Sequence, residues 1–317
     1  MSRTRLTSGW RRTAGVLAAL SVGAGLGPQA WADPEPKAAL PSGTTAAPVN
    51  GEAAAEACWL AESVVLGASV SAGAEVSLPG YPMKVMPTDA TLADVLWAIT
   101  DCKPEADYAS VYFFASAERN AESQITRARE ARPKIVFAID FLFWHVYGAK
   151  KGMSEPLTDD ERKALFERGL KRLEGFECPI VLADVPDMSH AISPFALQKP
   201  QVPSKAALDA VNARLAEWAK GRKNVVILSL KDVVAKAMAV EKVQLGGRTY
   251  EGSEARDLLA PSGLHATLTG LVAVGIECLD RMQAAGVAPK DAAWERDPAK
   301  VKERLLKLKP APAPKTK

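Results

Sequence analysis

The sequence predicts an α/β fold, a three-layer αβα sandwich built around a five-stranded, mostly parallel sheet. Short apolar runs rich in β-branched and aromatic residues alternate with longer segments of helical period. This alternation is typical of a parallel sheet that helices cover on both faces, with right-handed crossovers between the strands. The expected strands are Ser63 to Leu66, Tyr108 to Phe114, Lys134 to Phe143, Pro179 to Val185 and Asn224 to Leu230.

Four helices are expected between and after these strands. Each has apolar residues spaced so that they fall on one face, and one also has a capping box where it begins. They are Thr91 to Thr100, a helix that starts at the capping box of Thr158 and Glu161, one around Leu208 to Trp218, and Thr267 to Met282.

The two ends of the chain have compositions that differ from the middle. Residues 1–32 combine an arginine-rich start, a short apolar run and Ala30-Trp31-Ala32, which is typical of a secretory signal peptide. Residues 33–57 are rich in Ala and Pro, which predicts a linker, and residues 289–317 predict a charged Pro/Ala/Lys-rich tail with a short helix around Val301 to Leu308. We therefore expect one domain, residues 58–288, exported to the periplasm or the extracellular space.

Charge and motifs exclude several classes of partner. Removing residues 1–32 changes the net charge from +3 to −1, which does not support nucleic-acid binding. No later apolar run is long enough to span a membrane, so the mature chain is expected to have no transmembrane segment. The sequence has no Walker loop, dinucleotide fingerprint or metal-ligand spacing, so no cofactor and no metal are expected.

The chain has four cysteines, and an exported protein meets an oxidising compartment in which disulfides persist. Four thiols allow three pairings, and four buried free thiols are the alternative. Positions along the predicted elements favour Cys58 with Cys102 and Cys178 with Cys278, because each pair would lie at the lower edge of the sheet.

Two segments carry residues suited to catalysis at the carboxyl edge of such a sheet, where ligands of this fold class bind. Ser69 follows the first predicted strand within a turn of small residues, and His265 precedes the last predicted helix. An unactivated serine needs a base with a pKa near neutrality, which imidazole supplies. Taken singly, the first segment also fits a simple connecting turn, and the histidine fits a surface or capping residue.

The order and setting of these segments resemble the SGNH hydrolases, also called GDSL esterases and lipases, over roughly residues 60–285. Gly67-Ala68-Ser69 through Gly73 is similar to the family's Gly-Asp-Ser-x-x-x-Gly block, and Ser262-Gly263-Leu264-His265 is similar to its Asp-x-x-His block. The resemblance implies an SGNH or flavodoxin-like sandwich in which Ser69 is the nucleophile and His265 the base.

The sequence departs from the family pattern at four positions, one of which is Ala117, where the family has a glycine. Ala68 and Ser262 stand where the family has aspartates, and Asp140 lies where an asparagine of the oxyanion hole is usual. Asp140 is interpreted as a structural acid, since a buried carboxylate needs hydrogen bonds. The candidates for oxyanion or orienting roles are Ala117, Ser262, Asp257, Asp184 and Asp187, and His190 is a competing base.

The resemblance implies an exported serine esterase that hydrolyses acyl or acetyl esters through a Ser-His centre. Its substrate would be a small-molecule, lipid or glycan ester. The missing family residues favour the alternative, a catalytically degenerate SGNH-fold protein that binds a glycan or an envelope partner. A purely structural envelope protein is a third interpretation, which only the tail and linker support.

Overall fold

A computed structural model describes residues 58–81, 86–150, 154–194 and 196–311. Its main sheet has five strands in the order β2-β1-β3-β6-β7, and all of its pairs are parallel, which confirms the predicted fold class. The predicted signal peptide and linker lie outside the described residues. The strands are β1 (Ser63–Val65), β2 (Ala106–Asp107), β3 (Ile135–Phe137), β6 (Ile180–Ala183) and β7 (Val225–Leu228).

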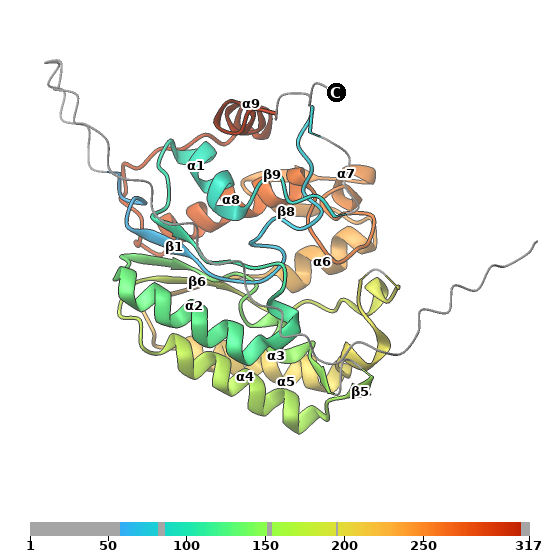
Figure 1. The fold of residues 1–317 in the computed structure, drawn as a ribbon. Helices are drawn as coiled ribbons and strands as arrows, with labels where there is room; N and C mark the ends of the chain where they lie inside the picture. The colour runs from blue at the N-terminus through green and yellow to red at the C-terminus, as the bar shows by residue number, and fades with distance from the viewer. Residues whose placement is uncertain (1–57, 82–85, 151–153, 195, 312–317) are drawn as a thin grey trace, which may run out of the picture. The chain divides into compact units, whose positions relative to one another are not determined.

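Helices cover the sheet on both faces (Figure 1). On one face α1 packs against α8 and α9, and on the other α4 packs between α2 and α5. The helices are α1 (Leu92–Thr100), α2 (Ala117–Ala131), α3 (Phe143–Val146), α4 (Asp159–Leu173), α5 (Lys205–Ala219), α6 (Leu230–Met238), α7 (Ser253–Arg256), α8 (Leu268–Ala284) and α9 (Pro298–Leu308). The short 3₁₀ helices are η1 (Phe113–Ser116), η2 (Ser189–Ala191) and η3 (Lys199–Gln201).

Threonine side chains cap three of the helices. The Thr91 side chain accepts a hydrogen bond from the Asp94 N–H at the start of α1, and Thr158 and Glu161 form the expected capping box of α4. Thr267 caps α8 through the N–H of Gly270. These caps satisfy backbone donors that a helix start leaves without an intrahelical partner, which is why the helices begin at these residues.

Two small antiparallel sheets lie outside the main one. The pair β4 (Ala149–Lys150) and β5 (Glu155–Pro156) follows α3, and β8 (Val243–Leu245) pairs with β9 (Arg248–Tyr250). Gly246 and Gly247 join β8 to β9, both with positive φ, which a two-residue hairpin turn of this type requires.

The second strand was predicted in the wrong place, and the third was predicted too long. The predicted strand Tyr108 to Phe114 is wrong: β2 ends at Asp107, whose carboxylate accepts the N–H of Ala109 and starts a turn. Tyr112, with 69% of its surface exposed, lies in this turn, so its aromatic ring is not a core strand residue. The third strand ends at Phe137 because the chain then turns, the N–H of Phe141 donating to the carbonyl of Ala138.

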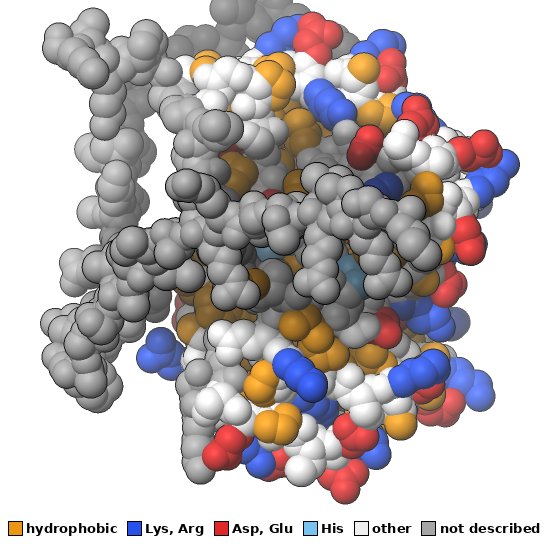
Figure 2. Space-filling model, turned by 90° about the vertical axis from the view of Figure 1, so that its right-hand side faces the viewer, with side chains coloured by type: hydrophobic (Ala, Val, Ile, Leu, Met, Phe, Trp, Pro, Cys, Tyr) orange, Lys and Arg blue, Asp and Glu red, His pale blue; other side chains and the backbone are white. Residues whose placement is uncertain are grey.

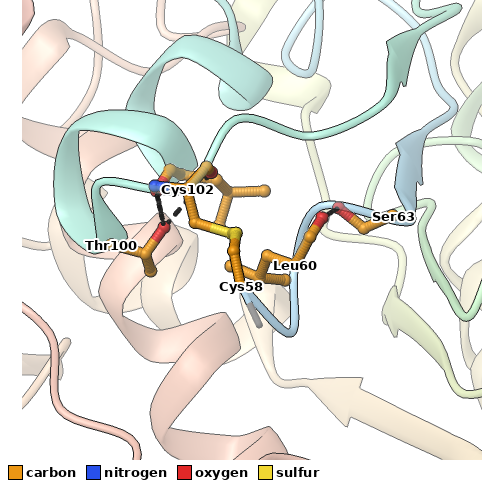
Figure 3. The surroundings of a disulfide bond; sticks show 6 residues. Cys58, Leu60, Ser63, Thr100 and Cys102 are labelled. Atoms are coloured by element: carbon orange, nitrogen blue, oxygen red, sulfur yellow. Dashed lines mark hydrogen bonds between the residues drawn. A yellow bond between two sulfur atoms is a disulfide. The ribbon is translucent and has the colours of Figure 1, made fainter. Parts of the chain in front are cut away.

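A disulfide joins Cys58 to Cys102, as expected, and Figure 3 shows it linking the segment before β1 to the end of α1. Thr100 and Cys102 also form hydrogen bonds with each other beside it. The predicted pair Cys178 with Cys278 is wrong, since both are free thiols. Cys278 is buried in α8, which packs over β7, whereas Cys178 precedes β6 and its carbonyl accepts from Asn224.

The packed structure continues past residue 288, where the sequence placed the end of the domain. Helix α9 contacts α1 and α8, and its residues Val301 and Leu305 are fully buried. The spacing of these two apolar residues puts them on one helix face, so this part of the predicted tail belongs to the core. Among the residues described, no helix is both long and apolar enough to cross a membrane.

Candidate functional site

The loop after β1 folds into a tight turn around Ser69. The N–H of Ala72 donates to the carbonyl of Ala68, and the N–H of Ala74 donates to the carbonyl of Ser69. The backbone N–H of Ser69 itself has no hydrogen-bond partner among the described residues. This turn therefore presents one free backbone donor next to a serine hydroxyl.

The carboxylate of Asp140 holds this turn in place. Its two oxygens accept hydrogen bonds from the N–H groups of Ala68, Val70 and Ser71, at 3.0, 2.8 and 3.2 Å, and from the hydroxyl of Ser71 at 2.6 Å. Burial raises the pKa of Asp140, and the hydrogen bonds from Ser71 and the backbone oppose that rise. Asp140 is tied to the backbone, in line with its interpretation as a structural acid.

Gly67 makes room for that carboxylate. It has a φ of +144°, and a Cβ atom placed on it would lie 2.1 Å from Oδ1 of Asp140. The amide of Gln124 pairs with both the N–H and the carbonyl of Gly67, each at 2.9 Å. The start of the serine turn is thus fixed from two directions, by α2 and by the loop after β3.

Three side chains form a continuous hydrogen-bonded chain at this edge of the sheet. The Ser69 Oγ lies 3.0 Å from the His265 Nε2, and the His265 Nδ1 lies 3.0 Å from the Glu75 Oε2. His265 is only 5% exposed. Its hydrogen bond to Glu75 holds the pKa of that carboxyl below its ordinary value, against the opposing effect of burial and with help from Ser262.

Local structure places each member of this chain. Glu75 follows the serine turn in a left-handed conformation with a φ of 63°, which is uncommon for a residue with a side chain. His265 lies just before α8, where its carbonyl accepts from the N–H of Ala260 and the N–H of Thr267 donates to Leu258. These backbone bonds tie the histidine segment to the strand-like stretch that precedes it.

Ser262 and His190 lie next to the hydrogen-bonded series of Ser69, His265 and Glu75 without belonging to it. The hydroxyl of Ser262 donates to Oε2 of Glu75 and accepts from the N–H of Leu264. His190, the competing base, has its Nε2 3.1 Å from the carbonyl of Gly263. No hydrogen bond joins His190 to Ser69 in the described structure, so the expectation of a competing base is not met by the geometry.

The other predicted candidates lie elsewhere. Asp184 accepts from the N–H of Lys231 at the start of α6 and from Ser229, and Asp187 accepts from the N–H of Ser189. Asp257 contributes its backbone carbonyl to Thr267, and Ala117 begins α2. None of the four hydrogen-bonds to His265 or Ser69 in the described residues.

Sequence reasoning missed Glu75. The predicted acids lie near His265 in the sequence or at the end of the fourth strand, whereas this glutamate lies six residues after Ser69. A signal was available, because Glu75 is the first carboxylate after the serine turn and follows directly on Gly73 and Ala74. Gly73 permits a close approach here, since a Cβ atom on it would lie 1.9 Å from the carbonyl oxygen of Ala90.

A mainly apolar pocket opens beside Ser69 and His265. Its polar side chains are Ser69, His265, Asp140 and Asp184, and the rest of its lining is almost wholly apolar. Figure 2 views the right-hand side of Figure 1, and histidine side chains are visible there with hydrophobic side chains beside them. In the described part of the chain, no group of three or more His, Cys, Asp or Glu residues is arranged to hold a metal ion.

Comparisons with known proteins give one structural likeness. No protein-family model matches the chain, and no curated protein matches it. A solved structure from Parabacteroides merdae, described as a GDSL-like lipase, is similar with a TM-score of 0.41 and 13% sequence identity. The match covers 71% of this chain and 95% of that one.

Proposed function

We propose that the protein is a serine ester hydrolase in which Ser69, His265 and Glu75 act as a triad. The observation that carries this proposal is the continuous contact from the Ser69 hydroxyl through both ring nitrogens of His265 to a carboxylate. A nucleophile, a base and a group that orients the base are the parts that acyl transfer needs. The resemblance of the two sequence blocks to SGNH hydrolases supports the same chemistry.

The reaction proceeds in two steps. The Ser69 Oγ attacks the ester carbonyl while His265 Nε2 accepts its proton, and Glu75 stabilises the resulting imidazolium through Nδ1. His265 then returns the proton to the leaving alcohol, which gives the acyl-enzyme. In the second step His265 removes a proton from water, the hydroxide attacks the acyl carbonyl, and the proton returns to Ser69 as the acid leaves.

Charge on the carbonyl oxygen needs hydrogen-bond donors in the transition state. The N–H of Ser69 is the donor that this site offers, because Asp140 already takes those of Ala68, Val70 and Ser71. Asp140 itself is an acceptor and is excluded from this role. One donor fewer than in a complete oxyanion hole typically costs about 10² to 10³ in rate, so we expect slow turnover.

The alternative is a protein of the same fold that binds a ligand without turnover. The observation that favours it is Asp140, an acceptor where the family has an asparagine donor. The apolar lining of the pocket fits an acyl group better than a glycan, whose hydroxyls need polar partners. We therefore place ester hydrolysis first.

Hydrolysis of p-nitrophenyl acetate and octanoate tests the proposal. We expect turnover by the protein and loss of it in Ser69→Ala and His265→Ala, with Ser123→Ala, at an exposed serine of α2, and His190→Ala as controls. Labelling of Ser69 by a serine-reactive phosphonate would support the same assignment. Absence of both turnover and labelling would favour the binding protein instead.

We also propose that the protein is exported. The signal-peptide pattern of residues 1–32 and the Cys58–Cys102 disulfide support this, since disulfides persist in oxidising compartments. Fractionation of a bacterial host that produces the full chain, with mass measurement of the mature N-terminus, tests it. A chain that stays in the cytoplasm with residues 1–32 intact would contradict the proposal.

A further inference from the structure

The pocket beside Ser69 shares a wall with a second cavity. Leu230, Val233 and Leu245 line both, and we call these three residues the partition. Leu230 and Val233 come from α6, and Leu245 ends β8 on the hairpin. Leu245 is the most buried member, with 3% of its surface exposed.

The two cavities differ in character. On the Ser69 side the pocket is mainly apolar, whereas the second cavity is lined by charged and polar side chains such as Asp232, Lys236 and Arg281. Glu277 lies there too, and it accepts hydrogen bonds from the N–H of Gly246 and from Arg281. The partition therefore separates an apolar space from a polar one.

The sheet order indicates how far the apolar pocket reaches. Ser69 follows β1, and α6 follows β7, with β3 and β6 between them. Three strand spacings of about 4.8 Å give roughly 14 Å between the two ends. Ile139 after β3 and Val185 after β6 continue the apolar lining across this distance.

An unbranched alkyl chain matches such a pocket. Each methylene that it buries strengthens binding about fourfold, and this gain ends where the walls become polar. A chain that starts at Ser69 and runs across the strand ends therefore meets its limit at the partition. Short acetyl groups would leave most of the apolar lining without contact.

We propose that the pocket binds a medium-length, unbranched acyl chain and that Leu245 sets the limit on its length. The inference rests on the proposed function for the ester, while occupancy of the pocket is measurable without hydrolysis. Shortening Leu245 would join the two cavities and admit a longer chain. The hairpin Val243 to Tyr250 would then be the element that determines substrate length.

Val243 provides a matched control. It lies on the same strand and the same buried face as Leu245, with 1% of its surface exposed, and lines the polar cavity without lining the pocket beside Ser69. Val243→Ala thus disturbs the hairpin and leaves the partition complete. Leu230→Ala, at a half-buried member of the partition, is a second opening variant should Leu245→Ala fail to fold.

The experiment measures binding of neutral alkyl methyl ketones to the full chain by calorimetry. Ser69→Ala is the common background, so that no covalent adduct forms. We expect affinity to rise about fourfold per methylene up to a medium chain and then to level off. With Leu245→Ala or Leu230→Ala, which vacate the space of an apolar side chain next to the pocket, the rise should extend by about two methylenes before it levels off, and with Val243→Ala the original limit should remain.

An unchanged length limit in both partition variants, or no binding of any ketone, would overturn the inference. A second assay separates this failure from failure of the proposed function. If ketones bind with the expected length limit but the wild-type protein hydrolyses no ester, the hydrolase proposal is refuted and the length limit stands. If wild type and Leu245→Ala hydrolyse esters with the same dependence on acyl-chain length, the proposed length limit is refuted and the hydrolase proposal stands.

Discussion

Ser262 donates a hydrogen bond to Oε2 of Glu75, the same carboxylate oxygen that lies 3.0 Å from Nδ1 of His265. Glu75 and His265 are separated by 190 residues, whereas Ser262 lies only three residues before the histidine. The carboxylate that contacts His265 therefore belongs to the loop that carries Ser69. Ser262 holds a hydroxyl that supports this acid.

Glu75→Gln tests the role of the carboxylate. The variant keeps the shape of the side chain but removes the charge that stabilises the imidazolium, so we expect kcat to fall by about 10² to 10⁴. Esterase kinetics with the wild type and the variant measure this, and Glu254→Gln, an exposed glutamate of α7, is the control. An unchanged kcat in Glu75→Gln would show that Glu75 takes no part in catalysis.

Moving the acid tests whether its place in the chain matters. Ser262→Asp in the Glu75→Gln background should regain part of the lost rate, because a carboxylate returns beside His265. The single variant Ser262→Asp should lower stability, since it places a second negative charge next to Glu75. The values of kcat/KM for the single and double variants measure the effect, and a double variant no faster than Glu75→Gln would contradict the prediction.

Glu75 also predicts a dependence of stability on pH. Its pKa is lower in the folded protein than its ordinary value of 4.5, first because of the hydrogen bond to His265. The stability that this contact provides is therefore fully present above pH 4.5 and is lost as the pH falls through the lower folded pKa. Thermal melts from neutral pH to below 4.5 should show a smaller acid-induced loss in Glu75→Gln than in wild type, and equal losses would refute the contribution.

Gly67→Ala should destabilise the serine turn. The added Cβ would lie 2.1 Å from the Asp140 carboxylate, and overpacking of this kind costs on the order of 1 to 3 kcal/mol, in addition to the strain of a positive φ. Gly221→Ala is the matched control, because Gly221 also has a positive φ but no atom within 4 Å of the added Cβ. Urea unfolding of both variants measures the effect. We expect the free energy of unfolding to fall more in Gly67→Ala than in Gly221→Ala.

The disulfide should contribute to stability through the unfolded chain. Cys58 and Cys102 are 44 residues apart, and closing a loop of this size contributes about 4 kcal/mol in the chain-entropy model. The double variant Cys58→Ser/Cys102→Ser should lower the free energy of unfolding, and reductant should lower the Tm of wild type only. Cys178→Ser, at a free and partly exposed thiol, should leave the Tm nearly unchanged.

The sequence by itself determined the features that local patterns encode. The alternation of strand and helix periods predicted the parallel sheet, and the capping box of Thr158 and Glu161 predicted the start of α4. Chain order also predicted that Ser69 and His265 would face each other at the carboxyl edge, where their side chains lie 3.0 Å apart. Each of these predictions rests on a stretch of neighbouring residues, whose spacing fixes which face they share.

Only the tertiary structure decided which distant groups meet. Glu75 reaches His265 because its own left-handed backbone conformation turns the chain after the serine loop. No periodic sequence pattern predicts such a conformation. Cys178 and Cys278 are both free thiols, because whether two cysteines meet depends on how whole elements pack and not on the sequence around each one. Contacts between residues so far apart in the sequence depend on how the core packs. The spacing of neighbouring residues does not encode that packing.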